Sequence, residues 1–222
     1  MNKEQMEEKE EIRIQNEQRE RIEKLHILNQ YAEKGQILFT GSSLMEQFPV
    51  NEILMTRGLS HKIYNRGVSG FTTADMLQNM NTMVFDLQPS RIFINIGTND
   101  IGAPDYSEDM LLSNYERILA QIKERLPQAE VYVMAYYPVN ETAKLSRCSQ
   151  GAAAFVNRNN QNIDEANHRI AGLAVKMGMH FIDVSEGLRD TQGKLKAEFT
   201  VEGIHMYANA YYIIFENMEK YL

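Results

Sequence analysis

The sequence has 222 residues, of which 43% are hydrophobic and 24% are charged. This length supplies one sizeable hydrophobic core and is short for two ordinary domains. Asp and Glu total 30 against 23 Lys and Arg, and the resulting net charge of -7 disfavours nucleic acid and anionic membranes as partners. The single cysteine, Cys148, excludes an internal disulfide and a thiolate metal cluster.

The N-terminus carries charge where an exported protein would carry apolar residues. Residues 1–20 are rich in Glu, Gln, Lys and Arg, whereas a signal peptide needs an apolar core. The chain has no stretch of roughly 18 apolar residues, which a transmembrane helix requires. The five histidines also lack the two-histidine spacing of a metal site. We therefore predict a cytoplasmic protein with no membrane span, no metal and no cofactor.

Residues 3–33 are predicted to form a charged helix, which Gly35 ends. Apolar side chains such as Leu25 arrive at loose helical spacing only toward the end of this segment, and they do not hold a heptad. A solvated helix packed by its second half is therefore favoured over a coiled-coil partner. We treat residues 1–34 as a helical extension and residues 35–222 as a single domain.

From residue 36 onward, short apolar runs alternate with amphipathic helical patterns. Such runs are typical of parallel strands buried between two layers of helices. The pattern predicts an α/β fold with an open, doubly wound, five-stranded parallel sheet in a three-layer α/β/α arrangement. The polar segment 140–154 is expected to be a loop. The predicted strands cover 36–40, 62–67, 91–97, 130–137 and 179–184, and the predicted helices cover 73–87, 107–126, 157–177 and 206–222.

Three strand ends carry residues suited to chemistry, and ligands bind at the carboxyl ends of the strands in such sheets. Residues 41–43 (Gly-Ser-Ser) offer a hydroxyl at the start of a helix. Gly67 offers a backbone N–H that a ligand can approach closely, and Asn99 offers a side-chain amide donor. Asp100 is assigned to structure, as an acceptor that ties neighbouring loops together.

A serine nucleophile needs a base, which is usually a histidine oriented by a carboxylate. Glu202 and His205 lie close together in sequence, on the predicted loop that returns from the fifth strand. Ser43, His205 and Glu202 therefore form a candidate catalytic set. The candidate donors to an oxyanion are the backbone N–H groups of Ser43 and Gly67 and the side chain of Asn99.

Asp183, at the end of the fifth predicted strand, is a second candidate for the orienting acid. In a common doubly wound strand order the fifth strand lies three positions from the first, so its end is roughly 14 Å from Ser43. Geometry therefore favours Glu202. A backbone carbonyl that orients the histidine without any acid is the third alternative.

Four segments of the chain resemble, in order, the four blocks of the GDSL-type (SGNH) hydrolases: FTGSSLMEQF, NRGVSG, IGTND and VEGIHM. They lie within residues 37–206 and follow the expected strand ends. Each block alone is short enough to arise by chance, but the ordered set is specific. The chain looks most like the short bacterial esterases related to platelet-activating-factor acetylhydrolase.

The resemblance implies a flavodoxin-like fold and an esterase that forms an acyl-enzyme on its serine. Two positions depart from the family pattern, because Ser42 and Glu202 stand where the family usually has Asp. The second departure puts the orienting acid in question. The roles implied by the matching blocks are nucleophile for Ser43, oxyanion donors for Gly67 and Asn99, and catalytic histidine for His205.

The resemblance further implies a small-molecule ester as the partner, with acetyl or another short acyl group. Three kinds of ester stay open, namely O-acetylated sugars, short-chain lipid esters and aryl esters. Formation of a homo-oligomer is also open. The alternative hypothesis is a non-catalytic flavodoxin-like module that binds a small anion or a protein.

Overall fold

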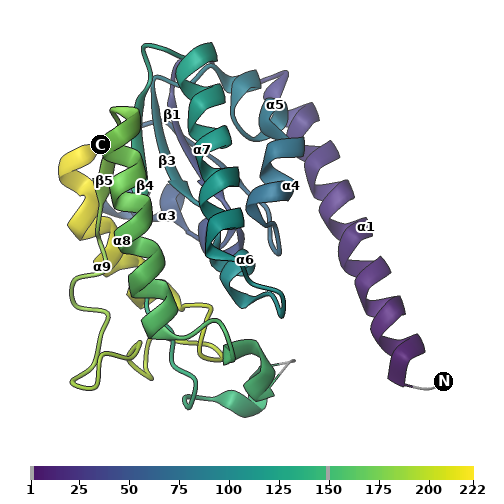
Figure 1. The fold of residues 1–222 in the computed structure, drawn as a ribbon. Helices are drawn as coiled ribbons and strands as arrows, with labels where there is room; N and C mark the ends of the chain where they lie inside the picture. Colours follow the sequence, from purple (N-terminus) through teal and green to yellow (C-terminus); the bar gives the residue numbers. More distant parts are fainter. Residues whose placement is uncertain (1–2, 149–150) are drawn as a thin grey trace.

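The computed structural model describes residues 3–148 and 151–222, which contain a five-stranded parallel sheet (Figure 1). The strand order is β2-β1-β3-β4-β5, and all four pairings are parallel. The predicted doubly wound sheet is therefore confirmed, with somewhat shorter strands at the third to fifth positions. The strands are β1 (Ile37–Gly41), β2 (Ile63–Gly67), β3 (Arg91–Asn95), β4 (Glu130–Met134) and β5 (His180–Ile182).

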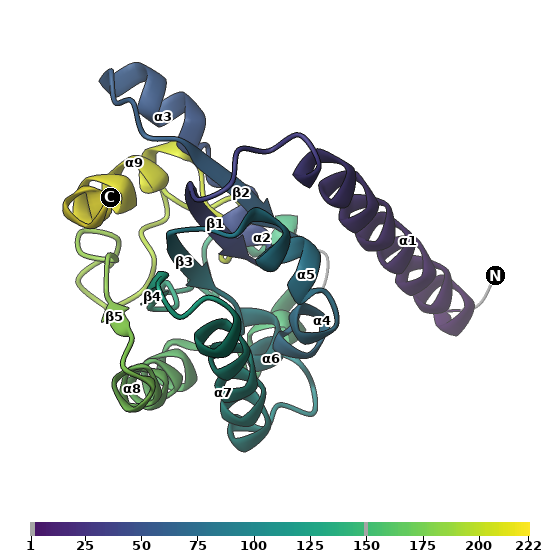
Figure 2. The ribbon, with the colours of Figure 1, turned by 90° about the horizontal axis from the view of Figure 1, so that it is seen from above.

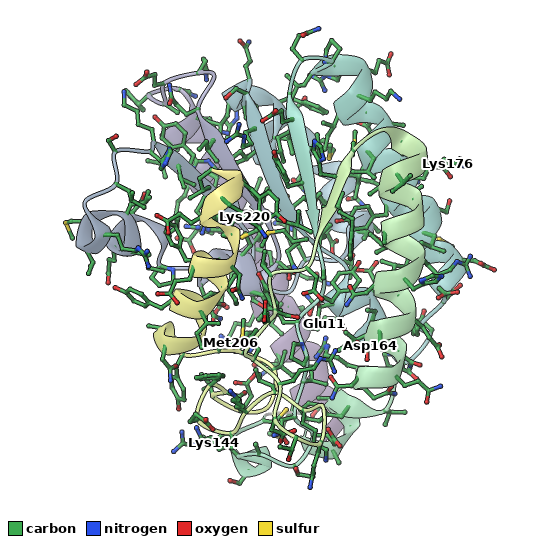
Figure 3. All side chains as sticks on the ribbon, turned by 90° about the vertical axis from the view of Figure 1, so that its left-hand side faces the viewer. Glu11, Lys144, Asp164, Lys176, Met206 and Lys220 are labelled. Atoms are coloured by element: carbon green, nitrogen blue, oxygen red, sulfur yellow. The ribbon has the colours of Figure 1, made fainter. Side chains whose placement is uncertain are left out.

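Helices cover both faces of the sheet, which gives the three layers expected (Figures 2 and 3). Figure 3 shows α8, which carries Asp164 and Lys176, and α9 on opposite sides of the sheet. One core lies beneath α1 (Lys3–Asn29), α4 (Thr73–Gln78), α5 (Met80–Met83), α7 (Glu108–Arg125) and α8 (Asn160–Met177). The other lies beneath α2 (Ser43–Glu46), α3 (Val50–Arg57) and α9 (Ala208–Met218), and a short α6 (Thr98–Gly102) follows β3. Single turns of 3₁₀ helix span Phe85–Leu87, Leu145–Arg147, Gly151–Phe155 and Glu219–Tyr221.

Residues at the ends of α7 and α8 account for where these two helices begin and end. The Ser107 hydroxyl accepts a hydrogen bond from the backbone N–H of Met110, which caps α7. The Asn159 side chain caps α8 in the same way, and Gly178 ends that helix with a φ of 74°. Both helices bury one apolar face against the sheet.

The single helix predicted over 73–87 is wrong, because the segment breaks into α4, α5 and a 3₁₀ turn. The Asn79 side chain donates to the backbone carbonyl of Asp75 at 2.8 Å, an interaction that competes with the helical ladder. Met76, Met80 and Met83 are nevertheless all buried. The apolar face predicted for this segment is therefore buried although the helix is interrupted. The segment predicted as a loop, 140–154, contains two 3₁₀ turns, and its residues 149–150 lie outside the described residues.

The chain after β1 packs closely against the end of β3, at the centre of the sheet. A Cβ atom at Gly41 would lie 1.9 Å from the carbonyl oxygen of Asn95, so only glycine fits there. The backbone N–H of Ser42 then donates to that same carbonyl at 3.2 Å. The loops after β4 and β5 gather at this end of the sheet, at the bottom of Figure 1.

The N-terminal helix α1 packs through its second half, as predicted. Leu25 is fully buried, and the Asn29 side chain donates to the carbonyl of Thr82 at 2.8 Å. The first half of α1 extends away from the rest of the molecule (Figure 2). Among the described helices, including α1, none has the length and apolar character that a membrane span requires.

Candidate active site

Ser43 is the first residue of α2 and lies at the carboxyl end of β1. Its residue surface is 7% exposed, and its Oγ lies 2.9 Å from Nε2 of His205. The preceding residue, Ser42, occupies the N-cap position without a side-chain capping bond. Neither serine side chain therefore caps the N-terminus of α2, and the Ser43 hydroxyl faces the imidazole of His205.

His205 and Glu202 form the second link of this chain of contacts. The Nδ1 atom of His205 lies 2.5 Å from Oε1 of Glu202, and the backbone N–H of His205 donates to the same oxygen at 2.9 Å. Thr200 ties the turn closed, because its hydroxyl donates to the His205 carbonyl and accepts from the Gly203 N–H. The three-residue spacing thus makes a compact turn that presents the carboxylate to its own histidine.

The environment of Glu202 keeps its carboxylate charged. Burial alone would raise its pKa, but the hydrogen bonds from the His205 ring and backbone leave the pKa below its ordinary value. An ionised carboxylate at Nδ1 fixes the tautomer, because Nδ1 must then carry the proton. The Nε2 atom is left as an acceptor for the Ser43 hydroxyl.

Asn99 lies in α6, directly after the end of β3. Its Nδ2 donates to the Phe71 carbonyl at 2.9 Å, and its Oδ1 accepts from Arg158 at 3.1 Å. The amide nitrogen carries two hydrogens, so one of them is left for a ligand. Both Asn99 and Ser43 line the same cavity.

The structure separates the two glycines of the segment 67–70. Gly67 is buried, its N–H donates to Oδ1 of Asn65 at 2.9 Å, and a Cβ atom there would lie 2.2 Å from the backbone nitrogen of Glu46. Gly70 lines the cavity with a φ of 80°, and within the described part of the chain its N–H has no acceptor. The N–H predicted for ligand contact at Gly67 is thus already engaged, and the available one is at Gly70.

Two other acidic residues lie apart from the imidazole. Asp100 accepts hydrogen bonds from the backbone N–H and hydroxyl of Thr73, which confirms the prediction that it ties loops together. Asp183 accepts from the N–H and hydroxyl of Ser185, at 2.9 and 2.6 Å. Of the two candidate acids, the structure brings Glu202 to His205.

The cavity beside Ser43 has a volume of about 710 Å³, and α1 forms one wall of it. Gln18 donates to the carbonyl of Ser69 at 3.0 Å, and Nε of Arg21 lies 3.1 Å from Glu46. No motif in the sequence marks this contact, because it depends on the angle at which the helix leaves the core. The wall consists of Ile14, Glu17, Gln18 and Arg21.

Most of the residues that line the cavity are polar, although the lining exposes about as much apolar as polar surface. Within residues 3–148 and 151–222, no three His, Cys, Asp or Glu side chains lie close enough together to hold a metal ion. Among the described residues, the aliphatic side chains that line the cavity are Ile14, Val68, Ala154 and Ile204. The arrangement can hold a polar small molecule against a hydroxyl, an imidazole and a set of N–H donors.

Known structures share this arrangement of the chain. The fold is similar to a solved structure from Streptococcus pneumonia described as a candidate platelet activating factor, with 30% identity and a TM-score of 0.88 over 99% of each chain. It also matches an acetylxylan esterase from Geobacillus stearothermophilus, solved as a catalytic mutant, with 14% identity and a TM-score of 0.61. That match covers 85% of this chain and 94% of the esterase, and at such low identity it supports the fold alone.

Sequence comparison gives one partial relative and one family. The chain is 21% identical over 187 residues to an N-acylneuraminate cytidylyltransferase of Escherichia coli, a match that covers 84% of this chain but 40% of that protein. The model of the GDSL-like lipase/acylhydrolase family matches residues 42–213, which include Ser43, Asn99, Glu202 and His205. The chain therefore belongs to the GDSL-like lipase/acylhydrolase family.

Proposed function

We propose that the protein is a serine esterase that cleaves short acyl esters of polar alcohols through an acyl-enzyme on Ser43. The observation that carries the proposal is the continuous contact from Ser43 Oγ to His205 Nε2, at 2.9 Å, and from His205 Nδ1 to Glu202, at 2.5 Å. A nucleophile, a base and an orienting acid within hydrogen-bond reach of one another are what acyl transfer to serine requires.

In the first step Ser43 Oγ attacks the ester carbonyl carbon while its proton passes to His205 Nε2. The resulting imidazolium is stabilised by the charged carboxylate of Glu202. When the tetrahedral intermediate collapses, the ester C–O bond breaks and His205 returns the proton to the departing alcohol. Water then attacks the acyl group with His205 again as the base, which releases the acid and restores the Ser43 hydroxyl.

We assign the oxyanion to three donors, one of which differs from the sequence prediction. They are the backbone N–H of Ser43, the free Nδ2 hydrogen of Asn99 and the backbone N–H of Gly70. The Ser43 N–H lies in the first turn of a helix, where backbone donors have no intrahelical acceptor. Gly70 replaces Gly67 because the Gly67 N–H already donates to Asn65.

The cavity lining favours a short acyl group on a polar alcohol. A long acyl chain needs an extended apolar surface, and among the described residues only Ile14, Val68, Ala154 and Ile204 bring apolar side chains to this cavity. Gln18, Arg21 and Arg147 offer donors that an alcohol rich in hydroxyl groups can use. The similarity in fold to an acetylxylan esterase supports an acetylated sugar as the first substrate class to test.

The test is a panel of p-nitrophenyl esters of increasing acyl length beside acetylated xylo-oligosaccharides and a short-chain lipid ester. We expect the acetyl ester to be hydrolysed with the highest kcat/KM of the aryl series and the acetylated oligosaccharide to exceed the lipid ester. Ser43→Ala should abolish all of these activities. If Ser43→Ala hydrolyses the panel at the wild-type rate, the nucleophile is wrong. If the wild type is inactive on every ester, the alternative of a non-catalytic binding module is favoured.

A further inference from the structure

Arg158 places a buried guanidinium directly behind Asn99. The residue lies just before α8 and is 9% exposed. Its Nε donates to the carbonyl of Thr98 at 3.0 Å, and its Nη2 donates to Oδ1 of Asn99 at 3.1 Å. The planar guanidinium thus binds both the backbone of Thr98 and the side chain of Asn99 in the turn that follows β3.

The charge of Arg158 is the unusual part of this arrangement. Buried arginines are normally paired with a carboxylate, because desolvating an isolated charge is costly. Among the described residues no carboxylate lies within ion-pair distance of this guanidinium, although the charge of Glu202 acts on it from farther away. Burial lowers the pKa of Arg158 from its ordinary value, which reflects the missing ion pair. A net positive charge is therefore kept beside the cavity.

Gly102 makes the space that the guanidinium occupies. A Cβ atom at this last residue of α6 would lie 2.1 Å from Nη2 and 2.4 Å from Cζ of Arg158. A side chain at position 102 would displace the guanidinium of Arg158 without removing its positive charge. The contact between Arg158 and the turn of α6 therefore depends on a glycine.

The two contacts of Asn99 determine which way its amide faces. If the amide were flipped, its NH₂ would face the donors of Arg158 and its oxygen would face the carbonyl of Phe71. Both contacts would then be repulsive, so Arg158 and Phe71 together allow one orientation. An amide whose oxygen accepts from a cation is also polarised, which strengthens its remaining N–H as a donor.

We propose that Arg158 is a positioning residue that orients and polarises the Asn99 side chain for the oxyanion of the acyl-transfer reaction. The inference rests on the proposed esterase function and deepens its oxyanion site. Arg158 also lines the cavity, but both hydrogen bonds of its guanidinium go to Thr98 and Asn99, so we assign its effect on the reaction to Asn99. Its positive charge is matched by the negative charge that develops on the ester oxygen only in the transition state.

The test compares kcat and KM for p-nitrophenyl acetate in Arg158→Met, Arg158→Lys and a control, Arg169→Met. Arg169 lies on α8 and forms an exposed ion pair with Glu108. We expect Arg158→Met to lower kcat by about tenfold to a hundredfold with little change in KM, a smaller loss than removal of the donor itself. Lysine lacks the planar fork, so Arg158→Lys should recover part of the loss. Arg169→Met should stay within about twofold of the wild type.

A double-mutant cycle with Asn99→Ala separates positioning from a general structural role. In the Asn99→Ala background, Arg158→Met should cost less than about threefold, because the group through which it acts is gone. Gly102→Ala offers an independent route, since it moves the guanidinium without removing it, and its kcat should fall as well. Thermal unfolding of each variant checks the fold.

Three outcomes would overturn the inference while leaving the esterase proposal intact. The first is a wild-type kcat in Arg158→Met, and the second is an equal loss in the presence and absence of the Asn99 side chain. The third is a loss that appears only in KM. An inactive wild type would overturn both proposals together, so the two kinds of failure are distinguishable.

Discussion

Two walls of one cavity differ in how they are held in place. The wall that carries Ser43, Asn99 and His205 lies at the carboxyl ends of the central strands, and each of these side chains is held by hydrogen bonds. The opposite wall comes from α1, whose residues 9–17 are exposed. Two polar contacts join it to the loop side, namely Gln18 with Ser69 and Arg21 with Glu46.

This difference assigns different tasks to the two walls. Atoms that make and break bonds must be held within a fraction of an ångström, which a wall held by hydrogen bonds at the ends of the strands achieves. A wall attached by a few polar groups, most of them half-buried, tolerates substitution and suits the selection of the alcohol. Substitutions in the first wall should therefore act on kcat, and those in the α1 wall should act on KM.

The largest effect should follow from removing either end of the Ser43–His205 contact. Ser43→Ala and His205→Ala should each lower kcat by at least about 10⁴-fold, because no nucleophile or no base is left. Steady-state hydrolysis of p-nitrophenyl acetate measures the loss.

Ser42→Ala is the matched control for the nucleophile. Ser42 is the neighbouring buried serine, and no partner for its Oγ exists in the described part of the chain. We expect a mild effect on kcat. A loss as large as that of Ser43→Ala would contradict the assignment of the nucleophile.

Removal of one oxyanion donor should have the next largest effect. Asn99→Ala should lower kcat by roughly 10²–10³, about 2.7–4 kcal/mol, because a preorganised donor to the transition state is lost. KM should change much less. If KM alone changes, Asn99 binds the ground state and does not belong to the wall that performs the chemistry.

The orienting acid should matter less than the base that it orients. Glu202→Gln should lower kcat by at least about tenfold but less than His205→Ala, since the imidazole loses its charged partner and keeps its position in the turn. Asp183→Asn is the control and should change stability more than kcat, because Asp183 bonds to Ser185. A silent Glu202→Gln combined with an impaired Asp183→Asn would reverse the two roles.

The α1 wall should respond in KM. Replacing Gln18 and Arg21 together by alanine removes two polar contacts of about 1 kcal/mol each and should raise KM by about threefold to tenfold for a polar ester. The value of kcat should stay within about twofold. Lys24→Ala, which breaks an exposed ion pair with Glu20 on the same helix, is the control. A fall in kcat without a change in KM would show that the two walls are not separable in this way.

The smallest effect is a pH dependence of stability. The folded pKa of Glu202 is lowered, so its carboxylate contributes stability above the ordinary Glu pKa, and this contribution is lost as the pH falls through the folded value. Urea unfolding should show a margin of wild type over Glu202→Gln that shrinks once the pH drops below about 4. A margin that grows on acidification would contradict the lowered pKa.

The sequence alone predicts the strand ends well, for a physical reason. Buried parallel strands are short apolar runs, and in an open sheet their carboxyl ends must meet, so the pattern of runs is enough to bring Ser43 and Asn99 to one edge. The contact of Glu202 with His205 is local, and the three-residue spacing predicts it equally well. The order of strands also accounts for the distance of Asp183 from the imidazole.

Other features depend on three-dimensional relations that a pattern does not contain. Gly67 and Gly70 lie in one motif, and only the contact with Asn65 shows which N–H is engaged. The break at Asn79 comes from a side chain that bonds to its own helix. The α1 wall and the guanidinium of Arg158 meet the site over long sequence separations without any motif to mark them.

The central claim is that Ser43 is a nucleophile activated by His205, and a fluorophosphonate probe tests it most directly. The serine oxygen displaces fluoride and forms a bond to phosphorus, and peptide mapping by mass spectrometry then locates the adduct. The account predicts one adduct per chain on the peptide that contains Ser43, none in Ser43→Ala and much slower labelling in His205→Ala. Labelling of another residue, or equal labelling of Ser43→Ala, would contradict it.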